Sequence, residues 1–117
     1  MLFVCYPKCT TCKNAQKWLD ENKINYEQRD IKTDNPGYDE LKEWLEKSGL
    51  PIKRFFNTSG LLYKSMGLKD KLAEMSDEEK LKLLATDGML VKRPILVGED
   101  FVLVGFKQPE WERILNE

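Results

Sequence analysis

The hydrophobic pattern changes twice within the first 31 residues, from a strand-like run to helical spacing and back again. The run "LFVCY", residues 2–6, is apolar, rich in strand formers and closed by Pro7, which is typical of a buried strand. From Thr11 the apolar residues follow helical spacing, and "YEQRDI", residues 26–31, has the composition of a second strand. A strand, a helix and a strand within this length are typical of a βαβ unit.

The middle of the chain predicts helices. "YDELKEWLEKSGL", residues 38–50, places Leu41, Trp44 and Leu45 on one helical face before Gly49 ends the helix. "PIKRFFNTSGLLYKSMGLKDKLAEM" follows and predicts several short helices. "SDEEKLKLLAT", residues 76–86, then begins with a serine and has a glutamate three residues later, which is the pattern of a capping box.

The last third of the chain returns to strands. The runs "RPILVG" and "FVLVGF" are separated by "ED", the spacing of a tight antiparallel hairpin. "PEWERILNE" then predicts a helix that begins at Pro109 and carries Trp111 on an apolar stripe. We expect Trp18, Trp44 and Trp111 to pack in the core, since each falls on such a stripe.

This order of elements is the thioredoxin-like arrangement. We therefore predict one α/β domain over residues 1–117, with a glutaredoxin-type mixed sheet of about four strands flanked by helices. A helical insert, approximately residues 37–88, separates the βαβ half from the ββα half. In such a fold the loop after the first strand ends at a helix N-terminus, and Cys9 and Cys12 occupy that place.

Composition excludes several classes of protein. The 19 basic and 20 acidic residues give a net charge of -1, which predicts no direct nucleic-acid binding. The sequence has no apolar run long enough for a membrane span and no pattern of a signal peptide, so we expect a cytoplasmic protein. It also contains no histidine, which excludes Cys-His nucleophile pairs and histidine-based zinc sites.

The Cys9-x-x-Cys12 pair favours redox chemistry. Unpaired N–H groups in the first turn of a helix stabilise a thiolate, and thiols in this setting have pKa values of about 3.5 to 7.5. Two intervening residues, Thr10 and Thr11, allow Cys12 to resolve a mixed disulfide formed on Cys9.

Three alternatives to a redox pair stay open at this stage. Structural zinc needs four ligands and the chain has three cysteines, so we predict no metal site. Cys5, Cys9 and Cys12 also match the spacing of a radical S-adenosylmethionine cluster loop, but Cys5 falls inside an apolar strand and is expected to be a small buried hydrophobe. Simple packing of the pair is the third alternative.

A second element supports the redox hypothesis. "KRPI", residues 92–95, precedes the first hairpin strand, where a thioredoxin-like fold holds a cis proline beside the reactive thiol. Arg93 would then meet a thiolate or a bound oxyanion, and Pro94 would present its backbone to a partner. The alternative is an ordinary trans proline beside a solvated arginine.

"YPKCTTCKNAQKWL", "FFNTSG", "LLATDGMLVKRPI" and "VLVGFK" together resemble the ArsC/Spx family, which is related to glutaredoxin-linked arsenate reductases. The resemblance covers essentially the whole chain and implies that Cys9 is the reactive cysteine and Pro94 the cis proline. Arsenate reductases of this type hold their oxyanion with several arginines, of which Arg93 matches one. Asn57 stands where another is expected, and Lys107 is the nearest basic residue to a third.

These residues lead to three functional hypotheses. The first is a cytosolic thiol-disulfide oxidoreductase in which Cys9 attacks, Cys12 resolves and Arg93 shapes the site. Substrate-binding residues would be Thr10, Thr11, Asn57, Pro94 and Lys107. No resident cofactor is expected, and glutathione, glutaredoxin or thioredoxin would be the external reductant of this protein. Its expected partner is such a thiol reductant or a disulfide-bearing protein.

The second hypothesis follows from the resemblance alone: an Spx-like redox-switched regulator that binds the RNA polymerase alpha subunit. The third is arsenate reduction that depends on glutathione or glutaredoxin. The "FFNTSG" segment stays open between a polar pocket lined by Asn57, Thr58 and Ser59 and a simple turn.

Overall fold

The centre of the fold is a mixed sheet of four short strands. The computed structural model describes residues 1–116, and the strands run in the spatial order β2-β1-β3-β4. Strands β1 and β2 are parallel, whereas β1 with β3 and β3 with β4 are antiparallel. The predicted mixed sheet is confirmed. The strands are β1 (Leu2–Cys5), β2 (Glu27–Asp30), β3 (Ile95–Val97) and β4 (Val102–Val104).

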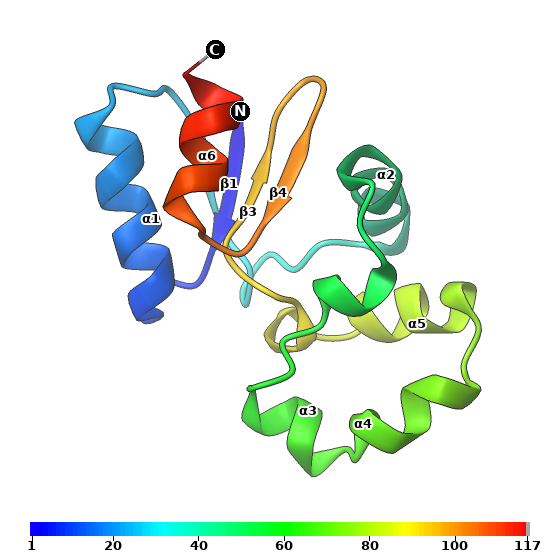
Figure 1. Ribbon diagram of the computed structural model, residues 1–117. Coiled ribbons are helices and arrows are strands. Elements are labelled where there is room, and N and C mark those ends of the chain that lie inside the picture. The colour runs from blue at the N-terminus through cyan, green and yellow to red at the C-terminus, as the bar shows by residue number, and fades with distance from the viewer. Residues whose placement is uncertain (117) are drawn as a thin grey trace.

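The two faces of this sheet are covered by different helices. Along β1 the side chains alternate, so Phe3 and Cys5 face one layer and Val4 faces the other. Helices α1 (Thr10–Glu21) and α6 (Gln108–Leu115) cover the first face, and α2 (Tyr38–Ser48) lies on the second (Figure 1). The predicted packing of the tryptophans is confirmed, since all three are buried: Trp18, Trp44 and Trp111.

The segment between β2 and β3 is a series of helices joined by turns and loops, as the sequence predicts. Gly49 ends α2 with a φ of 66°, a left-handed conformation that glycine adopts without strain. The capping box at the start of α5 is present, because Ser76 Oγ accepts from Glu79 N–H and Glu79 accepts from Ser76 N–H. The remaining helices are η1 (Ile52–Phe55), α3 (Leu61–Ser65), α4 (Leu68–Lys71), η2 (Leu72–Glu74), α5 (Asp77–Leu84) and η3 (Gly88–Leu90).

Two backbone segments join this insert to the sheet half. Asn57 N–H donates to Leu90 O at 2.8 Å, and Lys92 N–H donates to Phe55 O at 2.8 Å. Between these bonds lies an antiparallel bridge from Phe56 to Val91. The bridge therefore places the "FFNTSG" segment beside the chain that leads into Arg93 and Pro94.

The predicted hairpin is present, with shorter strands than the apolar runs imply. Gly98 N–H donates to Phe101 O at 2.9 Å, so the chain reverses around Glu99 and Asp100 as expected. Among residues 1–116, no helix has the length and apolar character needed to cross a membrane.

An ion pair fixes the start of α2 to β2. Arg29 donates through Nη1 to Glu40 Oε2 at 2.6 Å and through Nη2 to Glu40 Oε1 at 3.0 Å. The Arg29 side chain is 15% exposed and the Glu40 side chain 43%. Hydrogen bonds from Arg29 hold the pKa of Glu40 below its ordinary value despite partial burial.

We expect Glu40→Gln to lower the free energy of unfolding at neutral pH by about 1 kcal/mol, a value reduced for the exposure of Glu40. Because the pKa of Glu40 is lowered by folding, its contribution is present above the unfolded value of about 4.3 and is lost as the pH falls through the folded value. Urea unfolding at neutral and acidic pH checks this. Glu43→Gln, an exposed site on the same helix, is the control, and equal losses in both variants would contradict the prediction.

Candidate functional site

The turn between β1 and α1 positions Cys9 at the start of a helix. Cys9 N–H donates to Tyr6 O at 2.9 Å, which closes the turn after Pro7. Cys9 has extended backbone angles and is the N-cap residue of α1. Its side chain is half-buried. A hydrogen bond from the Cys12 backbone N–H, one of the groups that the first helical turn leaves unpaired, lowers the pKa of the Cys9 thiol.

The other two cysteines lie inside the protein. Cys12 is 2% exposed, and its Sγ accepts a hydrogen bond from Tyr6 N–H at 3.3 Å. Cys5 is 1% exposed and belongs, with Cys12, to the apolar cluster that includes Phe3 and Trp111. This confirms its predicted role as a small buried hydrophobe. All three are free thiols.

Cys9 and Cys12 have pKa values displaced in opposite directions. Burial alone would raise the pKa of Cys9, but the Cys12 backbone N–H, the Arg93 guanidinium and the Cys12 thiol outweigh it and lower that pKa. Burial raises the pKa of Cys12 to about 12, and negative charge on Cys9 adds to the increase. The accessible thiol is therefore the one that ionises first.

Arg93 reaches the thiol from the opposite half of the fold. The Arg93–Pro94 peptide bond is cis, as predicted. The Arg93 guanidinium lies over the Tyr6 ring, with Cζ 5.2 Å from the ring centroid. Its Nε and Nη1 atoms are buried and have no hydrogen-bond partner within residues 1–116. Buried N–H groups normally have a partner, so these two are available to a thiolate or to a bound molecule.

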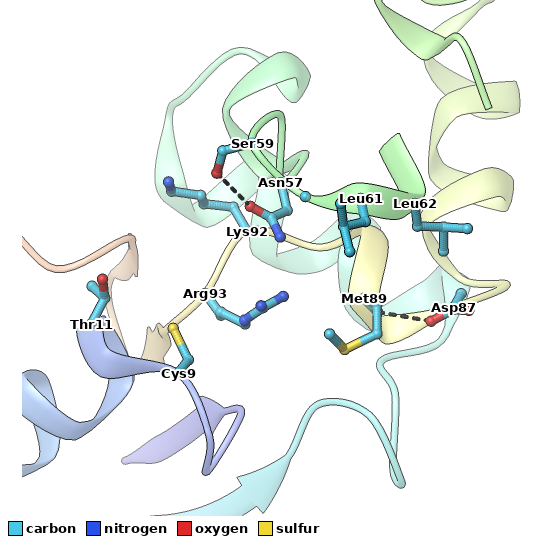
Figure 2. Close-up of a pocket in the computed structure, with 11 residues that line it drawn as sticks. Cys9, Thr11, Asn57, Ser59, Leu61, Leu62, Asp87, Met89, Lys92 and Arg93 are labelled. Carbon is cyan, nitrogen blue, oxygen red and sulfur yellow. Dashed lines mark hydrogen bonds between the residues drawn. The ribbon is translucent and has the colours of Figure 1, made fainter. Parts of the chain in front are cut away.

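A cleft of about 550 Å³ opens beside Cys9, between the sheet half and the insert (Figure 2). In Figure 2 the Arg93 side chain extends into the space between Cys9 and Met89. Both polar and apolar side chains surround this space, and Leu61, Leu62 and Met89 lie together on the side away from Thr11 (Figure 2). The cleft is lined by Cys9, Thr11, Asn57, Ser59, Gly60, Leu61, Leu62, Asp87, Met89, Lys92 and Arg93.

The "FFNTSG" segment serves as both a turn and a pocket wall. Gly60 N–H donates to Asn57 O at 3.0 Å, which forms the turn. Asn57 is 9% exposed, and Ser59 Oγ donates to Asn57 Oδ1 at 3.4 Å (Figure 2). Asn57 and Ser59 both line the cleft, so the two alternatives left open by the sequence are compatible.

The structure brings together some of the residues predicted for the site and separates others. Of the candidate side chains, Cys9, Thr11, Asn57 and Arg93 meet in the cleft. The cleft lining does not include Thr10, Cys12, Pro94 or Lys107.

Lys107 instead borders a second, smaller cavity, which is also lined by Thr11. Sequence reasoning missed Lys92, Asp87, Met89, Leu61 and Leu62. Only the position of Lys92 next to Arg93 pointed to any of these residues.

We expect Arg93→Gln to raise the pKa of Cys9, because the variant removes a positive charge that stabilises the thiolate. The rate of alkylation by iodoacetamide follows the thiolate fraction, so its pH profile should move to higher pH and the rate near neutral pH should fall several-fold. Peptide mass spectrometry identifies the alkylated cysteine. Arg113→Gln, an exposed arginine on α6, is the control, and an unchanged profile for Arg93→Gln would refute the expectation.

A thiol at the N-cap of the helix after a central strand, beside a cis X-Pro turn, defines a protein of the thioredoxin-like fold. The sequence model of the ArsC family matches residues 5–114, and the chain belongs to this family. The resemblance stated from the sequence motifs is confirmed.

Three relatives illustrate the range of the family. The crystal structure of an ArsC-family-related protein from Bacteroides fragilis is 57% identical, with a TM-score of 0.94 over 97% of this chain and 95% of that one. The uncharacterised protein YusI of Bacillus subtilis is 48% identical over 112 residues, which are 96% of this chain and 95% of YusI. The global transcriptional regulator Spx 2 of Bacillus anthracis is 27% identical over 107 residues, which are 92% of this chain and 80% of Spx 2.

Proposed function

We propose that the protein is a thiol-disulfide oxidoreductase in which Cys9 attacks a substrate disulfide and Cys12 resolves the product. One observation carries this proposal. The half-buried thiol of Cys9 has a lowered pKa and faces the cleft, whereas the Cys12 thiol, three residues later, is buried and has a raised pKa. An attacking thiol needs access and ionisation, and a resolving thiol needs only proximity.

The first step forms one sulfur-sulfur bond and breaks another. The Cys9 thiolate attacks a substrate R–S–S–R, a mixed disulfide Cys9–S–S–R forms, and the leaving thiolate takes a proton from water. Arg93 and the backbone N–H of Cys12 stabilise the attacking thiolate before this step.

The second step uses Cys12, and the structure supports an order for the two steps. Negative charge on Cys9 is one cause of the raised pKa of Cys12, and this charge disappears when Cys9 enters the mixed disulfide. Cys12 then loses its proton to solvent more readily and attacks Cys9 Sγ. The Cys9–Cys12 disulfide forms, and the second substrate thiol leaves.

An external thiol closes the cycle. Two electrons from glutathione, glutaredoxin or thioredoxin return the Cys9–Cys12 disulfide to two thiols, so no resident cofactor is needed. A reducing compartment supplies these thiols, and we therefore assign the protein to the cytoplasm.

A redox titration in glutathione buffers tests the proposal. The protein is equilibrated at defined ratios of thiol to disulfide and alkylated, and the Cys9–Cys12 disulfide is read by mass. We expect a reversible pair with a potential of about -270 to -200 mV, the range of thioredoxins and glutaredoxins. Absence of this disulfide at every ratio would overturn the dithiol mechanism.

A second candidate function is a redox-switched regulator of transcription. The similarity to Spx 2, a global transcriptional regulator, favours it, and the same Cys9–Cys12 pair would be the switch. The partner implied by the resemblance is the RNA polymerase alpha subunit. Binding of its purified C-terminal domain to the oxidised and the reduced protein is the test, and no binding in either state would exclude this function.

Arsenate reduction is the third candidate. The unpartnered Nε and Nη1 atoms of Arg93 favour an oxyanion near Cys9. Arsenate added to the reduced protein with glutathione should then oxidise Cys9, and a lack of arsenate-dependent oxidation would exclude it.

A further inference from the structure

A second cavity, of about 140 Å³, adjoins the Cys9 cleft. The two cavities share two lining residues, Thr11 and Lys92. Thr11 is the second residue of α1 and follows Cys9 by two positions. A group attached to the Cys9 sulfur therefore lies in the cleft that adjoins this second cavity.

Three cations from three separate parts of the fold line the cavity: Arg54, Lys92 and Lys107. Arg54 belongs to η1 of the insert, Lys92 precedes β3, and Lys107 precedes α6. A Cβ built on Gly105 would lie 3.5 Å from Lys92 Cε, so the Lys92 side chain lies over a residue that carries no side-chain atoms. The cavity is thus formed by tertiary contacts between segments distant in the sequence.

The charges in this cavity are not balanced. No aspartate or glutamate is among its lining residues. Arg54, Lys92 and Lys107 form no ion pair with the carboxylates of residues 1–116, whereas Lys17 and Lys82 each have one and Arg29 has two. Three cations around a small cavity without counter-charges produce a positive potential that attracts an anion.

We propose that this cavity binds a carboxylate of the substrate, so that Cys9 reacts preferentially with disulfides that carry an anionic group near the sulfur atoms. The inference rests on the proposed attack by Cys9 and names the substrate class. A carboxylate fits the available volume, and Arg54 and Lys107 supply charge-assisted hydrogen bonds to it. Arg93 lines the Cys9 cleft and not this cavity, so a variant that keeps Arg93 tests the cavity separately.

Three small disulfides of similar size provide the test: 3,3'-dithiodipropionate is anionic, bis(2-hydroxyethyl) disulfide is neutral, and cystamine is cationic. Each is mixed with reduced Cys12→Ser protein, in which the reaction stops at the mixed disulfide Cys9–S–S–R with release of R–S⁻. Intact mass against time gives the three rate constants.

The decisive variant is Arg54→Gln/Lys107→Gln in the same Cys12→Ser background. Both residues are exposed, so the fold is expected to survive their replacement. The rate with dithiodipropionate should fall about tenfold, the effect of two unit charges lost beside the reacting group. The rate with the neutral disulfide should stay within about twofold, and the rate with cystamine should rise.

Lys32→Gln/Lys71→Gln is the matched control, because it removes two positive charges at exposed positions outside both cavities. It should leave the ratio of the anionic to the neutral rate unchanged. Added salt should reduce the preference for dithiodipropionate in the parent protein.

Several outcomes would overturn the inference. It fails if Arg54→Gln/Lys107→Gln slows all three disulfides equally, if dithiodipropionate is unaffected, or if the control variant shows the same loss. If Cys9 reacts with the neutral disulfide and the anionic and cationic disulfides react at the same rate, the carboxylate site is refuted and the proposed function is not. Absence of any mixed disulfide on Cys9 would remove the proposed function as well.

Discussion

Replacing Cys9 by serine is expected to lower the rate of disulfide reduction by at least about 10³-fold, as removal of a nucleophile does in other enzymes. Cys9 is the cysteine that faces the cleft and has a lowered pKa. Cys5 and Cys12 are buried and have raised pKa values, so neither is available to attack in its place. The measurement is turnover of bis(2-hydroxyethyl) disulfide with glutathione as the electron donor.

Two further variants separate the roles of the cysteines. Cys5→Ala removes a thiol from the apolar cluster and should keep the rate within about twofold, since both thiols of the pair remain. Cys12→Ser should still form the mixed disulfide on Cys9 without resolving it. Retention of more than about a tenth of the parent rate by Cys9→Ser would show that another group is the nucleophile.

Replacing Trp111 by alanine is expected to lower the free energy of unfolding by about 3 to 5 kcal/mol. The Trp111 side chain is 0% exposed, and its ring makes edge contacts with Phe106 at 4.9 Å and Trp18 at 6.2 Å between centroids. Its Nε1 donates to Gly105 O at 3.1 Å. Loss of this side chain therefore leaves a cavity under α1 and α6.

Trp111→Phe distinguishes packing from the hydrogen bond. It keeps an aromatic ring but leaves the Gly105 carbonyl without its donor, and should cost less, about 1 to 3 kcal/mol. Urea unfolding of the three proteins gives both values. A loss below about 1 kcal/mol for Trp111→Ala would contradict the assigned role of this residue in the core.

The regular elements were predictable because each has a local signal. The strand formers of β1 and the Ser76–Glu79 capping box act through near neighbours in the chain. The hairpin strands were overestimated in length, because an apolar run marks burial rather than backbone pairing. Phe101, for example, continues the apolar run but lies in the loop before β4.

The candidate site was predictable only in part. Cys9 and Arg93 were expected to meet because the order of elements brings the end of β1 beside the segment before β3. Lys107 and Thr11 were expected to act with them, and Lys107 lies in the adjacent cavity instead of the cleft. Leu61 and Met89 also line the cleft. Their segments are brought together by the Phe56–Val91 bridge, whose residues are 35 positions apart in the sequence.

The sequence by itself determined the element order, the place of two cysteines at a helix start and the position of the proline before β3. These follow from periodicity and composition, which act over a few residues. Only the tertiary structure decided which thiol ionises and which charges surround it, because burial and the approach of Arg93, Arg54 and Lys92 depend on how the insert packs against the sheet.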